Sequence, residues 1–149
     1  MKIQSGVYEK GTISLEQIYT EIRKHPDISK AGDIVSFTGI VRGETVNGEK
    51  VTKLKIEAYK EQADKKLRLI SEDLRKIKGI IEVILIHLIG EFSVGEEMVY
   101  VVIAGAHREE SFNTLIKAVN RYKKEAPFWK KEFQSSGKSY WIEDPMHEK

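Results

Sequence analysis

The stretch IIEVILIHLIGEFSVGEEMVYVVIAGA, residues 80–106, decides the fold because it holds two apolar runs joined by a short polar segment. The first run, residues 80–90, is interrupted by Glu82 and His87 and falls short of the roughly 20 residues that a membrane-spanning helix needs. Its length and its content of Ile and Val are typical of a buried strand. The segment EFSVGE then leads to a second strand at residues 97–106.

Outward from this pair, helical and extended patterns alternate along the chain. Helices are expected at residues 14–25, where Ser14 and Gln17 have the spacing of a capping box, at residues 60–79, and from about residue 107 to Pro127. Further strands are expected at residues 2–9, 33–43, 52–59 and 138–144. The Asn47-Gly48 pair suits a tight turn and predicts a hairpin between residues 33–43 and 52–59. This pattern predicts a mixed α+β fold in one domain, residues 1–149.

Composition narrows the class of protein. The chain has 149 residues, 25 Lys and Arg against 23 Asp and Glu, and a formal net charge of +2, which gives no general reason to bind nucleic acid or a membrane. It has no cysteine, and therefore no disulfide, thiolate metal site or thiol nucleophile. The four histidines show no metal-ligand spacing. We expect an intracellular, cytoplasmic protein without a metal.

The segment AHREESFNTLIKAVNRYKKEAPFWKKE, residues 106–132, concentrates cations and aromatic residues. On a helical wheel centred on Phe112, Ile116 and Lys123 fall on the same stripe, whereas Lys124 lies about 100° away from Lys123. Two interpretations follow. Lys123 extends its charge to solvent at the helix end, or it is held in a partly apolar pocket where loss of solvent makes the amine a usable nucleophile or acid-base group.

Two further features of this segment carry charge. His107 and Arg108 come after an apolar strand and before a helix, a place where an anion such as phosphate can bind, or where both side chains have only a capping role. Arg42 joins them only if the fold brings its turn close. After Pro127 the chain can run extended, which would bring Lys130 toward the cleft of Lys123 or make a plain edge strand.

The segments SFTGIVRG, IEAY, IHLIGEFSVGE, AHREESF and KKEAPFWKKE, in this order, resemble the large subunit of molybdopterin synthase, the MoaE family. The residues after Tyr59, KEQADKK, depart from the proline or methionine that many members carry. The resemblance implies an α/β-hammerhead fold with an additional small antiparallel β-subdomain. It also implies that two dithiolene sulfurs are added to cyclic pyranopterin monophosphate (precursor Z), each brought as a thiocarboxylate on the C-terminal Gly-Gly of a small ubiquitin-like subunit.

The resemblance assigns roles to single residues and predicts an assembly. It implies catalytic roles for Lys123 and Lys130. It implies substrate-binding roles for Arg42, His107, Arg108 and Phe37. It implies a homodimer at the centre of a heterotetramer, and no cofactor. The absence of cysteine agrees with a sulfur that arrives on a partner.

Two other classes of function stay open at this point. A non-catalytic phosphometabolite-binding module would keep the His107-Arg108 site without a use for Lys123. An RNA-binding domain could use Phe128 and Trp129 beside lysines as a stacking platform, although the near-zero net charge disfavours it.

Overall fold

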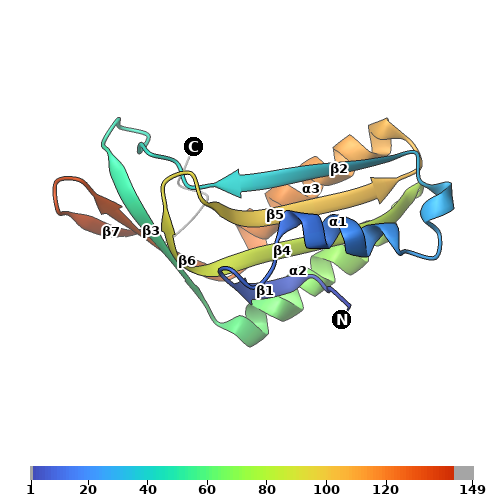
Figure 1. The fold of residues 1–149 in the computed structure, drawn as a ribbon, viewed down its shortest axis with the longest axis horizontal. Coiled ribbons are helices and arrows are strands. Elements are labelled where there is room, and N and C mark those ends of the chain that lie inside the picture. Colours follow the sequence, from blue (N-terminus) through green and yellow to red (C-terminus); the bar gives the residue numbers. More distant parts are fainter. Residues whose placement is uncertain (1, 143–149) are drawn as a thin grey trace.

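The computed structural model describes residues 2–142 and has the predicted α+β class. Figure 1 shows a long, bent sheet with helices on both faces. The elements in chain order are β1 (Gly6–Glu9), α1 (Leu15–Arg23), the short 3-10 helix η1 (Ile28–Lys30), β2 (Asp33–Ile40), β3 (Val51–Ala58), α2 (Lys60–Arg75), β4 (Ile80–Ser93), β5 (Glu97–Gly105), α3 (Arg108–Glu125), β6 (Phe128–Gln134) and β7 (Ser139–Ile142).

The long strand β4 organises the sheet, whose order is β2-β5-β4-β3-β6-β7 with β1 added in parallel to β4. The first part of β4, from Ile80 to His87, pairs with β5, and its last part, from Gly90 to Ser93, pairs with β3. Gly90 lies at this change of partner with a φ of 130°, a backbone conformation that favours glycine. The antiparallel strands β3, β6 and β7 form the smaller end of the sheet, which is the predicted additional β-subdomain (Figure 1).

Helices cover the two faces of the β4-β5 region. In Figure 1, α1 lies in front of these strands, whereas α2 and α3 lie behind them and contact each other. Strands β4 and β5 are therefore buried on both sides, as their continuous apolar runs predicted. Their fully buried side chains include Val83, Leu85, Ile86, Val101 and Ile103.

The predicted capping box at the start of α1 is confirmed. The Ser14 hydroxyl accepts a hydrogen bond from the Gln17 backbone N–H at 3.3 Å, and the Gln17 side-chain oxygen accepts one from the Ser14 backbone N–H at 2.8 Å. This reciprocal pair fixes where the helix begins. Ile18 and Ile22 then face the core.

The predicted hairpin between residues 33–43 and 52–59 is wrong. Strand β2 ends at Ile40 and pairs with β5, and β3 pairs with β4 and β6, so the two strands lie in different parts of the sheet. The Asn47-Gly48 turn does form, with the Gly48 backbone N–H bonded to the Thr45 carbonyl at 3.0 Å. It closes only a small excursion with one bridge, between Glu44 and Lys50. A local turn signal cannot reveal that β5, more than fifty residues later, is the better partner for β2.

Other boundaries shift by a few residues. Helix α2 ends at Arg75, and Gly79, with a φ of 89°, lies in the turn that leads into β4. The predicted last strand also included Glu143 and Asp144, which lie outside the described residues. Among residues 2–142, no helix is both long enough and apolar enough to cross a membrane.

Candidate active site

Helix α3 packs on the sheet through three small side chains and one tyrosine. Its buried positions recur at helical spacing, and they are Ser111, Thr114, Ala118 and Tyr122. The helix approaches β5 so closely that a Cβ on Gly105 would collide with the Ser111 hydroxyl. It ends where the Ala126 backbone N–H bonds to the Tyr122 carbonyl at 3.0 Å, one residue before Pro127.

The prediction that Lys123 lies on the buried stripe of this helix is wrong for the single chain. Phe112 and Ile116, on which the stripe was centred, are 52% and 59% exposed, and Lys123 is exposed as well. The wheel was centred on Phe112, whereas the face that packs on the sheet is centred on Ser111, Thr114 and Ala118, whose small side chains allow close approach.

Strand β6 brings Lys130 back beside the end of α3. The extended run predicted after Pro127 is confirmed, but β6 is not an edge strand, because it lies between β3 and β7. Phe128 and Lys130 are two residues apart and share a face of the strand. Lys130 lies opposite the buried Ile56 of β3, on the face toward the core.

A buried histidine joins these two elements. The imidazole of His87, on β4, is 1% exposed and stacks on Phe128 with ring centroids 3.9 Å apart and planes 22° from parallel. The edge-to-face contact of the same ring with Tyr122 has a centroid distance of 5.7 Å. Burial, followed by the charge of Lys130 and then that of Lys123, lowers the pKa of His87 to about 3, while its hydrogen bond to Leu88 opposes the shift. Both lysines are therefore close enough to act on one buried ring.

One signal in the sequence marks His87, which together with Glu82 interrupts the apolar run of residues 80–90. The four histidines show no metal-ligand spacing, and nothing in the position of His87 indicates that it meets the helix and the strand that carry the lysines. Those contacts join residues more than thirty positions apart.

Phe37 and Arg42 belong to the same end of the molecule as the lysines. Phe37 is half-buried on β2 and lies near Gly39. Gly39 pairs with Val99 of β5, and Val99 also pairs with His87 of β4, so Phe37 lies at the level of His87 in the sheet. Arg42 follows the end of β2 and is exposed.

His107 and Arg108 lie at the opposite end of the same strands. They follow the end of β5, where Gly105 pairs with Asp33 at the start of β2. Arg42 comes nine positions after Asp33, which corresponds to about 30 Å along an extended strand. Lys123 comes fifteen positions after Arg108, which corresponds to about 22 Å along the axis of α3. One chain therefore brings Arg42, Lys123 and Lys130 to one end and the His-Arg pair to the other.

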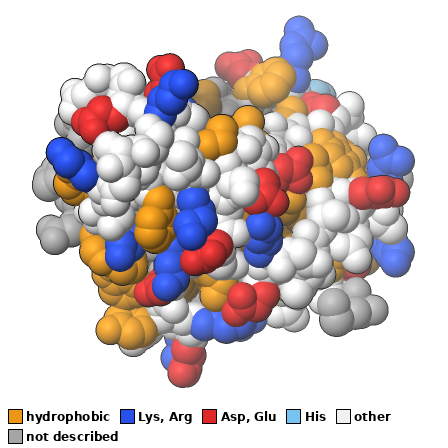
Figure 2. Space-filling view, turned by 60° about the vertical axis from the view of Figure 1, so that its left-hand side comes forward, with side chains coloured by type: hydrophobic (Ala, Val, Ile, Leu, Met, Phe, Trp, Pro, Cys, Tyr) orange, Lys and Arg blue, Asp and Glu red, His pale blue; other side chains and the backbone are white. Residues whose placement is uncertain are grey.

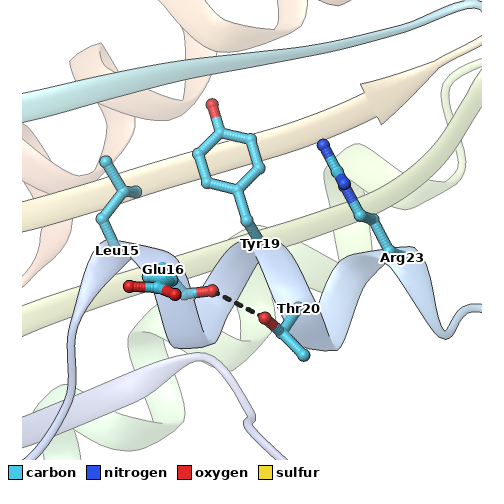
Figure 3. A pocket seen from close by; sticks show the side chains of 5 residues that line it. All are labelled: Leu15, Glu16, Tyr19, Thr20 and Arg23. Atoms are coloured by element: carbon cyan, nitrogen blue, oxygen red, sulfur yellow. Dashed lines mark hydrogen bonds between the residues drawn. The ribbon is translucent and has the colours of Figure 1, made fainter.

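Two surface hollows lie away from the lysines. A groove of about 480 Å³ follows α1. Figure 3 shows that Leu15, Tyr19 and Arg23, which line it, all point upward from the helix in this view. The Tyr19 hydroxyl donates to the Ser36 hydroxyl of β2 at 2.9 Å, which fixes the ring in this groove. None of the predicted site residues lines it.

The second hollow, of about 300 Å³, lies on the outer face of the small sheet. It is lined by Glu57, Ala58, Tyr59, Trp129 and Trp141. Since Trp129 and Lys130 are adjacent on β6, they project from opposite faces, so this hollow is separate from the lysines. The view of this end in Figure 2 shows apolar and basic side chains interspersed over the surface.

Within the part of the chain that the structure describes, no group of three or more His, Asp or Glu side chains could hold a metal ion. The predicted site residues and His87 offer amines, guanidinium groups and imidazoles.

Comparisons with known proteins agree on one family. Residues 8–125 match the sequence profile described as MoaE protein, a match that includes Lys123 and ends before Lys130. The molybdopterin synthase catalytic subunit of Pyrococcus abyssi is 40% identical over 119 residues, which cover 80% of this chain and 79% of that one. The subunit of the same name from Escherichia coli is 36% identical over 112 residues, which cover 75% of this chain and 73% of that one.

A solved structure supports the same relationship. The crystal structure of molybdopterin synthase from Staphylococcus aureus superposes with a TM-score of 0.80 and 33% identity, over 95% of this chain and 98% of that one. The sequence profile, the relatives and the fold all agree, and the chain belongs to the MoaE family.

Proposed function

We propose that this chain is the catalytic subunit of a molybdopterin synthase. It would transfer sulfur from the thiocarboxylated C-terminal Gly-Gly of a small ubiquitin-like subunit to cyclic pyranopterin monophosphate, forming the dithiolene of molybdopterin. The observation that carries the proposal is that Lys123 follows Tyr122 on α3 and Lys130 lies two residues after Phe128 on β6, and both of these rings contact the buried His87. A family in which relatives are named catalytic subunits provides the reaction.

The two lysines have a direct use in such a reaction. A thiocarboxylate tail is an anion, and two ammonium groups hold it by charge-assisted hydrogen bonds. Once the tail sulfur has bonded to the substrate, water attacks the tail carbonyl, and the same groups stabilise the negative charge that develops there. The acyl–sulfur bond then breaks, the sulfur stays on the substrate and the tail leaves as an ordinary carboxylate. The chain itself provides no sulfur, because it has no cysteine.

The partner subunit is part of the proposal. A structure from Helicobacter pylori with a TM-score of 0.68 and 17% identity is described as a protein-protein complex of subunits 1 and 2 of molybdopterin-converting factor. The likeness at this identity concerns the fold. We propose a corresponding small subunit for this chain, whose Gly-Gly tail reaches the lysine end of the sheet.

A second copy of the chain would complete the site. Arg42, Lys123 and Lys130 lie at one end of a single chain, and His107 and Arg108 lie at the other. If all five act on one substrate, the His-Arg pair must come from a neighbouring copy. A two-fold dimer would then make two equal sites, each with the lysines of one chain and the anion-binding pair of the other.

The test is reconstitution. The purified chain is incubated with precursor Z and a thiocarboxylated small subunit, and oxidised pterin products are detected by fluorescence. The matched control uses the same small subunit with an ordinary C-terminal carboxylate. We expect product only with the thiocarboxylate, and a chain that gives no product with either tail would overturn the proposed function.

A further inference from the structure

The His87 side chain is the one fully buried imidazole among the described residues, and neither lysine role explains why it is there. A polar ring inside an apolar strand costs free energy unless its polar atoms are bonded. Its Nδ1 lies 2.9 Å from the Leu88 carbonyl oxygen. Because a carbonyl can only accept, Nδ1 carries the proton and Nε2 of the neutral ring carries the lone pair.

The chemistry of this ring excludes one role. With a pKa of about 3, set first by burial, His87 stays neutral throughout the physiological range and cannot donate a proton as a general acid. Its two ring contacts point to another role. Tyr122 is the residue before Lys123 in the last turn of α3, and Phe128 is two residues before Lys130 on β6.

The imidazole is therefore wedged across the corner at Pro127, where the chain turns from the helix into the strand. It stacks on Phe128 and makes an edge-to-face contact with Tyr122. The hydrogen bond to Leu88 holds the ring in one orientation, and β4 is the central strand of the sheet. Any movement of α3 relative to β6 must displace this ring.

We propose that His87 is a positioning residue whose neutral ring, clamped between Tyr122 and Phe128, sets the relative placement of Lys123 and Lys130. The proposal rests on the proposed sulfur transfer for its catalytic consequence, but the placement itself is a property of the folded chain. The neutral state has a second use, since a charged ring beside two ammonium groups would repel both.

The test compares three substitutions. His87→Leu keeps apolar bulk and removes the flat ring, so single-turnover sulfur transfer should fall about 100-fold, as misplacement of reacting groups does. His87→Phe restores an aromatic ring and lacks only the bond to Leu88, so the rate should recover to within about tenfold of wild type. Val83→Ala is the control, because it removes buried volume four residues away on the same strand. Val83 has no ring that could contact α3 or β6, so this variant should transfer sulfur at a rate near wild type.

A second readout is independent of sulfur transfer. The side-chain 13Cε NMR signals of lysines, assigned with Lys→Arg variants, report the surroundings of each amine. We expect the signals of Lys123 and Lys130 to move in His87→Leu and to hold their positions in Val83→Ala, with the exposed Lys124 as the internal reference.

The outcomes separate the two proposals. If the wild-type chain transfers no sulfur but the lysine signals respond as described, the proposed function fails and the positioning role stands. If His87→Leu transfers sulfur at close to the wild-type rate with both signals in place, the positioning role is overturned. The same conclusion follows if Val83→Ala disturbs rate and signals as much as His87→Leu does, because the effect would then be general loss of packing.

Discussion

Lys123 and Lys124 are adjacent exposed residues in the last turn of α3, yet they differ in what they reach. Only Lys123 contributes to lowering the pKa of His87, together with Lys130. Lys123 directly follows Tyr122, whose ring contacts His87, whereas Lys124 starts about 100° farther around the helix. The role proposed for Lys123 therefore rests on its place beside Tyr122 and not on burial, because the single chain leaves it in solvent.

Lys123→Ala should abolish sulfur transfer, because it removes one of the two amines proposed to hold the thiocarboxylate tail. The folded chain should still bind the small subunit, since truncating one exposed side chain leaves most of an interface intact. Transfer is measured by the fluorescence of oxidised pterin, and binding by calorimetry. The matched control is Lys124→Ala, which should keep near wild-type activity. Equal activity of the two variants, whether high or absent, would contradict the assignment of Lys123.

At the scale of elements, the sequence predicted correctly those features that depend only on neighbouring residues. The Ser14 capping box, the stop at Pro127 and the apolar runs of β4 and β5 depend on neighbours in sequence, and each was confirmed. The failures depend on distant partners. The strand partner of β2 and the buried face of α3 are chosen by the sheet, and the small side chains at Ser111 and Ala118 gave no apolar signal.

The same lesson applies to the site. The helical wheel singled out Lys123, and the extended run after Pro127 raised Lys130 as its neighbour, but neither pattern could reveal the ring that lies between their elements. His87 becomes informative only when β4, α3 and β6 meet. The distance between Arg42 and the His107-Arg108 pair is likewise set by the length and pairing of β2 and β5. The identity of the charged residues alone does not reveal it.

Helices α2 and α3 are joined by an ion cluster that should make their packing sensitive to acid. Arg121 donates to both carboxylate oxygens of Glu125, at 2.7 and 2.9 Å, and to Asp73 of α2 at 2.9 Å. The hydrogen bonds from Arg121 are the main reason why the pKa of Glu125 lies below its ordinary value. Since the folded pKa is lowered, this contribution is fully present above the unfolded value of 4.5 and is lost as the pH falls through the folded value.

Glu125→Gln should therefore lower the free energy of unfolding by about 0.5–1.5 kcal/mol at neutral pH. Below pH 4.5 the difference from wild type should shrink as the wild-type carboxylate takes up a proton. Urea unfolding at several pH values and one fixed protein concentration measures both effects. Glu61→Gln is the control, because its pair with Lys65 is highly exposed and should contribute little at any pH. A difference between Glu125→Gln and wild type that stays constant into acid would contradict the proposed linkage.

At the scale of the whole molecule, the sheet separates charges that the proposed reaction needs together. Strands β2 and β5 run side by side in opposite directions, so residues that follow their two ends lie at opposite ends of the same ladder. Helix α3 runs back along these strands and returns the chain from His107 to the lysine end. A single chain can thus offer half of an anion-binding site at each end, and a two-fold pair can close both halves.

Complementation between two inactive variants tests this arrangement. In the proposed site, Lys123→Ala lacks one of the two amines and Arg108→Ala lacks a guanidinium of the phosphate site, so each variant alone should be impaired. Co-expression with two different affinity tags allows the mixed dimer to be isolated. If each site combines the lysines of one chain with the His-Arg pair of the other, one of the two sites in the mixed dimer is intact, and its activity should be about half that of wild type. If each site instead uses residues of a single chain, both sites of the mixed dimer carry a defect and activity stays at the level of the parents.

Arg108→Ala alone tests the phosphate contact. Losing a charge-assisted bond to phosphate should weaken precursor binding by about ten- to a hundredfold. An Arg108→Ala variant that matches wild type in precursor affinity and rate would remove Arg108 from the proposed site.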